Sequence, residues 1–153
     1  VLWDVQTYAN YEIPYEYKYK NFRLPKYIHG AEELYKQLSN DKPYVLVHRR
    51  SFRYSDGFPI NIDNFRKANN LPNIRIIEIT EGITDNMMQF VPLIERAEEI
   101  HVVASSFHCL VDCMYNKTNG KLFFHDIRAD AIMKINSAEN NNCWTIVKYE
   151  IKL

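Results

Sequence analysis

Short apolar runs rich in Val and Ile recur along this chain, and they constrain its fold more than any other feature. Each run is nearly continuous in apolar residues, as a strand that is buried on both faces requires. Polar stretches and segments with helical spacing separate the runs, so strands and helices are expected to alternate. The predicted strands are YVLVH (44–48), IRIIEIT (74–80), IHVVA (100–104) and KLFFHD (121–126), followed by a last strand or tail, WTIVKYEIKL (144–153).

This alternation is typical of an α/β protein with a mainly parallel sheet. Right-handed crossovers place helices on both faces of such a sheet, so the sequence predicts a Rossmann-like three-layer lobe. We assign residues 41–153 to this lobe. Ligands of such sheets bind beyond the carboxyl ends of the strands, so the residues that follow each strand are the candidates for a site.

Residues 1–40 are predicted to form an N-terminal extended segment and a short helix. The stretch YEIPYEYKYKNFRLPKY alternates aromatic and charged residues, which suits an extended segment lying on a surface; it serves either as packing or as an interface. HGAEELYKQLSN (29–40) predicts a helix, with Glu32 and Glu33 complementing the dipole of its first turn. Because the chain begins with Val and starts abruptly, we expect a fragment or processed product, in which this segment enters from another lobe.

Further helices are predicted between the strands. Residues 61–70 allow one or two helical turns, and residues 86–98 predict a longer helix with Asp85 as its N-cap and an irregularity at Pro92. The last helix follows the serine pair at 105–106, because apolar residues then recur at helical spacing, at Phe107, Leu110, Val111 and Met114.

The composition argues against two classes of partner. Hydrophobic residues make up 46% of the 153 residues and charged residues 25%, which is enough apolar material for the core of one domain or lobe. Lys plus Arg and Asp plus Glu number 19 each, so the neutral chain has no global field for nucleic acid, and any anion site must be local. No run approaches the roughly 18 apolar residues of a membrane span.

Cys109, Cys113 and Cys143 are interpreted as thiols in a reducing compartment, so a cytoplasmic location is expected.

Two of the strand ends together suggest a site for a diphosphate. His48, Arg49 and Arg50 follow the first strand, and the third strand leads into the helix that starts at Ser105, Ser106 and Phe107. Guanidinium groups match phosphate oxygens, and a helix N-terminus favours negative charge. The alternative is that the arginines are solvated loop residues and the serines only cap the helix.

The loop after the second strand supplies the candidates for contact with a ribose or a base. These residues are Glu81, Gly82, Thr84 and Asp85. His101 lies within a strand and is predicted to be a core histidine.

Other chemistries have weaker signals. A zinc set could be drawn from His108, Cys109, Cys113 and His125, but their spacing matches no common pattern, so we assign no metal and no cofactor. The chain has only four glycines and none of the glycine-rich phosphate-loop motifs.

The order of YVLVHRR, IRIIEIT, RAEEIHVVASSFHCLVD and KLFFHD resembles the C-terminal, donor-binding lobe of GT-B glycosyltransferases. It is similar to the heptosyltransferase-like and fucosyltransferase-like groups, and to glycosyltransferases carried by marine viruses and microbes. HRR (48–50) resembles the H-x-R element of fucosyltransferases, in which an Arg grips the donor phosphates. The aspartate expected shortly after that element is at best Asp56, displaced by several residues.

The resemblance implies a donor lobe that binds a nucleotide sugar, from which the complete enzyme would transfer the sugar to an unknown acceptor. It implies a partner lobe that contributes the acceptor site, and no residue here qualifies as the catalytic base. Two alternatives stay open. The chain could be a non-catalytic nucleotide-binding module of the same fold, or a viral interaction module that uses its tyrosine-rich N-terminal segment.

Overall fold

The computed structural model describes residues 3–50, 57–127 and 143–149, and these ranges contain a five-stranded, all-parallel sheet. The strand order is β2-β1-β3-β4-β5. The sheet confirms the predicted α/β class with a Rossmann-like arrangement. Its strands are β1 (Tyr44–His48), β2 (Arg75–Glu78), β3 (Glu99–Val102), β4 (Lys121–Asp126) and β5 (Trp144–Lys148).

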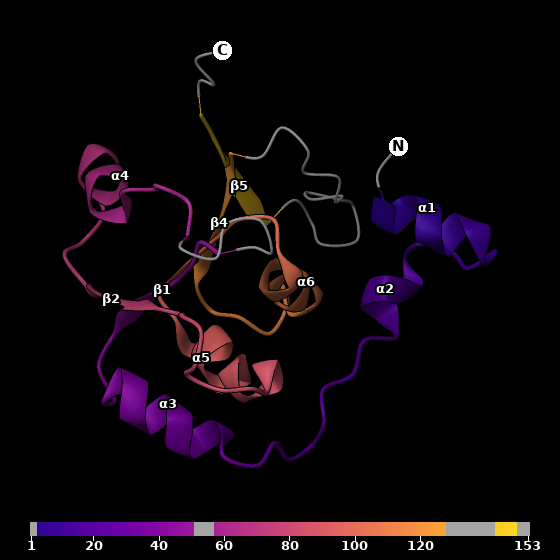
Figure 1. Cartoon of the computed structure of the whole chain (residues 1–153), viewed down its shortest axis with the longest axis horizontal. Coiled ribbons are helices and arrows are strands. Elements are labelled where there is room, and N and C mark those ends of the chain that lie inside the picture. Colours follow the sequence, from indigo (N-terminus) through magenta and orange to yellow (C-terminus); the bar gives the residue numbers. More distant parts are fainter. Residues whose placement is uncertain (1–2, 51–56, 128–142, 150–153) are drawn as a thin grey trace.

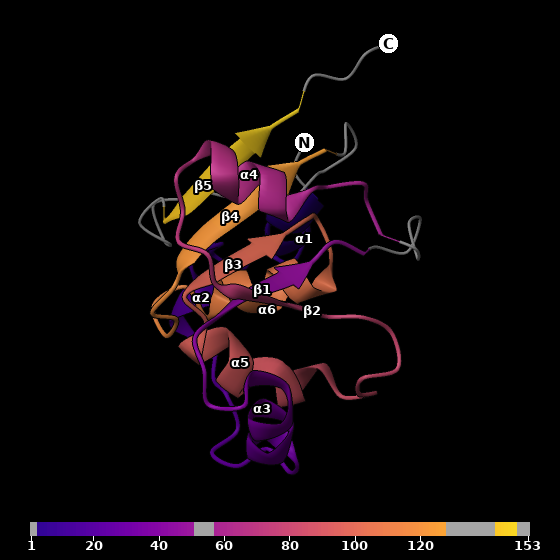
Figure 2. The same ribbon diagram turned by 90° about the vertical axis from the view of Figure 1, so that its left-hand side faces the viewer.

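Helices cover both faces of the sheet, which gives three layers (Figures 1 and 2). One face carries α3 (Ala31–Ser39), the 3-10 helix η1 (Met87–Phe90), α5 (Val91–Arg96) and α6 (Ser106–Cys113), and the other carries α4 (Ile62–Ala68). No helix within the described ranges is long and apolar enough to cross a membrane.

The side chains of β1 alternate between the two faces. Tyr44 and Leu46 belong to the core beneath α5 and α6, whereas Val45 and Val47 pack in the core that contains Ile62 of α4. Because successive side chains of a strand point to opposite faces, an unbroken apolar run serves both cores.

The predicted strands agree closely with the observed ones. β1 and β4 begin and end at the predicted residues, while β2 and β3 are shorter than predicted. β5 pairs parallel to β4, and residues 150–153 of the predicted last strand lie outside the described residues.

The predicted helix at 86–98 is interrupted, and its predicted cap is wrong. η1 changes into α5 at Val91, with Pro92 in the first turn of α5, where a missing amide proton is tolerated. Asn86, rather than Asp85, caps η1: its backbone is extended and its side-chain oxygen accepts from the Met88 amide at 3.1 Å.

Two short helices near the N-terminus correct the predicted extended segment. These are α1 (Trp3–Asn10) and α2 (Tyr17–Lys20), which lie beside α6 (Figure 1). Helices this short are marginal on their own, so contacts with the rest of the protein must hold them.

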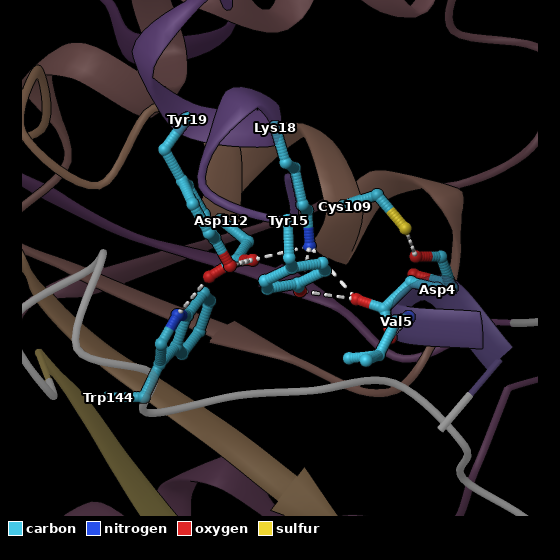
Figure 3. Close-up of polar contacts among 9 residues, drawn as sticks. Asp4, Val5, Tyr15, Lys18, Tyr19, Cys109, Asp112 and Trp144 are labelled. Carbon is cyan, nitrogen blue, oxygen red and sulfur yellow. Dashed lines mark hydrogen bonds and ion pairs between the residues drawn. The ribbon is translucent and has the colours of Figure 1, made fainter. Parts of the chain in front are cut away.

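Those contacts form a buried polar cluster, called here the Asp112 cluster (Figure 3). Asp112 Oδ2 accepts from Lys18 Nζ at 3.0 Å and from the Tyr19 hydroxyl at 2.8 Å. Asp112 Oδ1 accepts from the indole of Trp144, next to the start of the sheet's last strand, at 2.9 Å. The members of the cluster are Asp4, Tyr15, Lys18, Tyr19, Asp112 and Trp144.

Asp112 is fully buried and still ionised. Burial opposes ionisation, but the charge of Lys18 and the hydrogen bonds from its partners outweigh it and hold the pKa of Asp112 below its ordinary value. Burial also opposes the charge of Lys18, and Asp112 more than offsets that effect and raises the pKa of Lys18. Lys18 also pairs with Asp4 at 3.3 Å, so removing Lys18 takes a counter-charge away from two buried carboxylates.

We predict that Lys18→Met lowers the free energy of unfolding by about 3–5 kcal/mol, because it leaves the Asp112 carboxylate without its counter-charge. Lys148→Met is the matched control, since Lys148 pairs with Asp126 at 2.6 Å but is 76% exposed. It should change the free energy of unfolding by less than about 1 kcal/mol. Urea denaturation measures both values, and equal effects would contradict the buried role of Lys18.

Candidate functional site

The order of the strands reverses between β1 and β3. The chain leaves β1 to form β2 on one side and then returns to form β3 on the other. In open parallel sheets such a switch point opens a crevice at the carboxyl ends of the two strands, which is where ligands bind. Here those ends are His48 and the turn after Val102, so the structure brings together the two segments that the sequence analysis selected.

His48 and Ser105 are in contact across this crevice. The Ser105 hydroxyl lies 3.3 Å from His48 Nδ1 and accepts from the His108 amide at 3.2 Å, which makes Ser105 the N-cap of α6. The ring of His48 lies against that of Phe107, with centroids 4.9 Å apart. Ser105 is therefore a helix cap, and it also connects the two strand ends.

The start of α6 leaves polar groups near this crevice. Ser106 is the exposed first residue of the helix, and Phe107 follows it with a side chain buried in the core. First-turn amides have no intrahelical partner, so the amides of Ser106 and Phe107 can donate to an anion. The contribution of Phe107 to a site is consequently its backbone, because its ring packs between His48 and Phe90.

Arg49 makes contacts that the sequence analysis did not foresee. Its guanidinium donates to both carboxylate oxygens of Glu78 on β2, at 2.6 and 3.4 Å, and to the carbonyl of Phe58 at 2.9 Å. The Phe58 amide also donates to the Arg49 carbonyl at 2.7 Å. Arg49 thus joins the end of β1 to Phe58 and to Glu78 of β2.

Arg50 differs from Arg49 in its pairing. Its Nε is buried and has no hydrogen-bond partner within the described residues. Its charge acts on the neighbouring imidazole: burial first, and Arg50 second, lower the pKa of His48 to about 4. A buried donor without a partner indicates a place where an acceptor can bind.

The second predicted set forms a separate loop between β2 and η1. Glu81, Gly82 and Asp85 are exposed, and Gly82 has a φ of 85°, which favours glycine. The Thr84 hydroxyl bonds to the side chain of Gln89 and accepts from the Asn86 amide at 3.0 Å, so it shapes the loop. Within the described part of the chain, no hydrogen bond or ion pair joins this set to His48 or Ser105, and Asp56 lies outside the described residues.

A pocket of about 350 Å³ opens beside the crevice on the face that carries α4. Arg49, Glu78, Asn61 and Asp63 supply its polar lining, and Val47 and Ile76 are among the apolar residues at its wall. The pocket is open to solvent, and both positively and negatively charged side chains line it. It therefore offers a place into which a ligand bound at the strand ends can extend.

The histidines and cysteines that were considered as zinc ligands, His108, Cys109, Cys113 and His125, lie in different surroundings. In the ranges that the structure describes, no group of three or more His, Cys, Asp or Glu residues is arranged to hold a metal ion. His108 packs against Phe124 and Trp144, and Cys109 donates to the Ser105 carbonyl at 3.3 Å. Burial raises the pKa of Cys113 to about 11, so this thiol stays protonated and a weak nucleophile.

Sequence reasoning missed two features of this region. Glu78 lies inside a strand, where its pairing with Arg49 has no sequence signal. His101, predicted to be a core histidine, is buried as expected, but both its nitrogens are hydrogen-bonded in a chain that includes Glu99 and His125. The alternation of polar and apolar residues in β3 could have indicated the pairing of Glu99 with His101 on one face.

No protein-family model, curated protein or solved structure matches this chain. A function for this chain is therefore inferred from the geometry of the described residues.

The buried His108 imidazole gives a prediction on stability. Neither of its nitrogens has a hydrogen-bond partner within the described residues, and burial lowers its pKa to about 4. An unfolded histidine takes up a proton near pH 6.5. Between these values the unfolded chain binds more protons, so His108 makes the free energy of unfolding fall as the pH drops from about 6.5 to about 4.

We predict that His108→Leu raises the free energy of unfolding by about 1 kcal/mol at pH 7 and by more at pH 5, because it removes an unpaired polar group and its proton linkage. Urea denaturation at the two pH values measures the effect. His101→Leu is the control, and it should destabilise the protein because it removes the partner of Glu99 and His125. A destabilised His108→Leu variant with the wild-type pH dependence would contradict this account.

Proposed function

We propose that this chain is the donor-binding lobe of a glycosyltransferase that uses a nucleotide sugar, and that the diphosphate binds between the ends of β1 and β3. The observation that carries the proposal is the buried Nε of Arg50, which has no hydrogen-bond partner among the described residues and lies beside His48, the contact of the α6 N-cap. A guanidinium next to His48 and a helix N-terminus capped at Ser105 provide the positive potential that a diphosphate requires.

The chemistry of sugar transfer fits this arrangement. When the nucleoside diphosphate is displaced from the anomeric carbon of a nucleotide sugar, negative charge develops on the departing diphosphate. Arg50 and the amides of Ser106 and Phe107 would stabilise that charge in place, since they need not reorganise during the reaction. The neutral state of His48 supports hydrogen bonding at the edge of this site rather than an additional charge.

Arg49 has a positioning role in this proposal. Its bidentate pair with Glu78 fixes the backbone that leads into Arg50, and the pocket that these two residues line offers space for another part of the donor. The exposed loop of Glu81, Gly82, Thr84 and Asp85 is proposed as the contact for the ribose or the base, because it follows the neighbouring strand β2 at the same edge of the sheet.

A thermal-shift screen of the full-length protein against nucleoside diphosphates and their sugars tests the donor site. A ligand at 100 times its dissociation constant should add about 2.7 kcal/mol of stability, which raises the melting temperature by several degrees.

We predict that Arg50→Ala raises the dissociation constant of the selected nucleotide roughly 10- to 100-fold, because a charged hydrogen bond contributes about 1.5–3 kcal/mol.

Arg23→Ala is the matched control for the change of charge. Arg23 is exposed and donates to the carbonyls of Lys20 and Phe22, far in sequence from either strand end. It should leave the dissociation constant within twofold of the wild-type value. Wild-type affinity in Arg50→Ala, or a protein that responds to no nucleotide, would refute the proposed function.

A further inference from the structure

A continuous chain of hydrogen bonds crosses the sheet on the face that carries α4. It begins at a bidentate ion pair, in which Arg66 of α4 donates to both carboxylate oxygens of Glu99 at 3.0 Å. Glu99 Oε2 lies 3.2 Å from His101 Nε2, and His101 Nδ1 lies 2.8 Å from His125 Nε2. His125 Nδ1 lies 2.6 Å from the hydroxyl of Tyr149.

Only the last member of this chain reaches the surface. Arg66, Glu99, His101 and His125 are each at most 4% exposed, whereas Tyr149 is 37% exposed. Glu99 is the first residue of β3, and Tyr149 directly follows the last residue of β5. The chain of hydrogen bonds therefore runs from the amino edge of the sheet to its carboxyl edge, the edge where ligands of parallel sheets bind. Figure 2 shows the parallel direction of β3, β4 and β5.

The chemistry of the buried end fixes the proton positions in the two imidazoles. Burial opposes the ionisation of Glu99, but the hydrogen bonds from Arg66 and His101 outweigh it and keep the pKa of Glu99 below its ordinary value. Burial lowers the pKa of His101 to about 4, and burial together with His101 lowers that of His125 to about 3. Near neutral pH the carboxylate thus only accepts, and each imidazole carries one proton.

One arrangement of the protons satisfies every contact. His101 must donate from Nε2 to Glu99, so its Nδ1 accepts and His125 must donate from Nε2. His125 Nδ1 then accepts, and the hydroxyl proton of Tyr149 points inward to it. The phenol has no second proton, so towards solvent its oxygen can only accept a hydrogen bond. This selects a ligand group that donates, such as a hydroxyl.

We propose that Tyr149 accepts the proton of a substrate hydroxyl, with His125, His101 and Glu99 as the relay behind it; the role as base for the sugar acceptor rests on the proposed function. The hydroxyl proton moves to the Tyr149 oxygen while the Tyr149 proton moves to His125 Nδ1. The substrate oxygen keeps the electron pair of its O–H bond and attacks the anomeric carbon, from which the nucleoside diphosphate leaves with the other pair.

Burial disfavours the charge that this step creates, and the Glu99 carboxylate at the buried end of the relay offsets part of that cost. The proton taken up by His125 makes an imidazolium, and its Nε2 proton can pass to His101 Nδ1, which brings the positive charge next to the Glu99 carboxylate. Glu99 stays ionised, held by Arg66. The ring of Phe65 packs edge-on against those of His101 and His125, each with centroids 5.5 Å apart, and both imidazoles are only 1% exposed.

Tyr149→Phe tests the proposal in the full-length protein, with the nucleotide sugar that the thermal-shift screen selects. The readout is nucleoside diphosphate released, first with water and then with added monosaccharides as acceptors. We expect kcat to fall about 100-fold or more, the effect of losing a general base, and KM for the donor to stay within twofold. Tyr11→Phe, at an N-terminal tyrosine that is 74% exposed, should keep both wild-type values.

Nitrogen NMR of labelled histidine tests the proton positions that the relay requires. At pH 7 both His101 and His125 should carry their proton on Nε2, and in Tyr149→Phe the Nδ1 resonance of His125 should shift because it loses its donor. A proton on Nδ1 of either imidazole would overturn the relay.

The outcomes separate this inference from the proposed function. Donor binding with equal kcat in the wild-type and Tyr149→Phe proteins would overturn the relay and leave the donor site intact, and donor binding without any release by the wild-type protein would overturn it as well. A wild-type protein that binds no nucleotide would overturn the proposed function, and with it the role of Tyr149 as base.

Discussion

Parallel pairing throughout the sheet is the constraint on which the rest of the structure depends. Parallel strands all end at the same edge, so residues far apart in the chain meet there once the strand order is set. The reversal between β1 and β3 selects which ends share a crevice, and so brings His48 to Ser105 at 3.3 Å. The same pairing aligns β4 and β5, which places Tyr149 beside His125 at that edge.

Buried charge occurs on both faces of this sheet, with different consequences. On the face of α6, hydrogen bonds of the Asp112 cluster hold α1 and α2, two helices that are too short to be stable alone. On the face of α4, the pair of Arg66 and Glu99 continues through two imidazoles to a partly exposed phenol. Replacing buried ion pairs by apolar residues is often neutral or stabilising, so stability alone does not explain a polar chain that leads to the surface.

The accuracy of the sequence predictions follows the strength of the local signal. The strands 44–48 and 121–126 were predicted at their observed bounds because each has consecutive apolar residues with polar residues on either side. The cap at Ser105 was also predicted, since it stands between strand spacing and helical spacing. Asn86 replaced Asp85 as a cap because both residue types cap helices and only the backbone geometry selects between them.

By itself, the sequence determined the α/β class, the parallel sheet and the polar segments that follow its strands, because periodicity and capping are local properties of the chain. The tertiary structure decided what could not be local. It bound Arg49 to Glu78, left the Nε of Arg50 without a partner among the described residues, folded the N-terminal segment onto Asp112, and placed a predicted core histidine in a chain of hydrogen bonds. Each of these features depends on contacts between side chains of different strands and helices, and the order of the strands determines which of those contacts form.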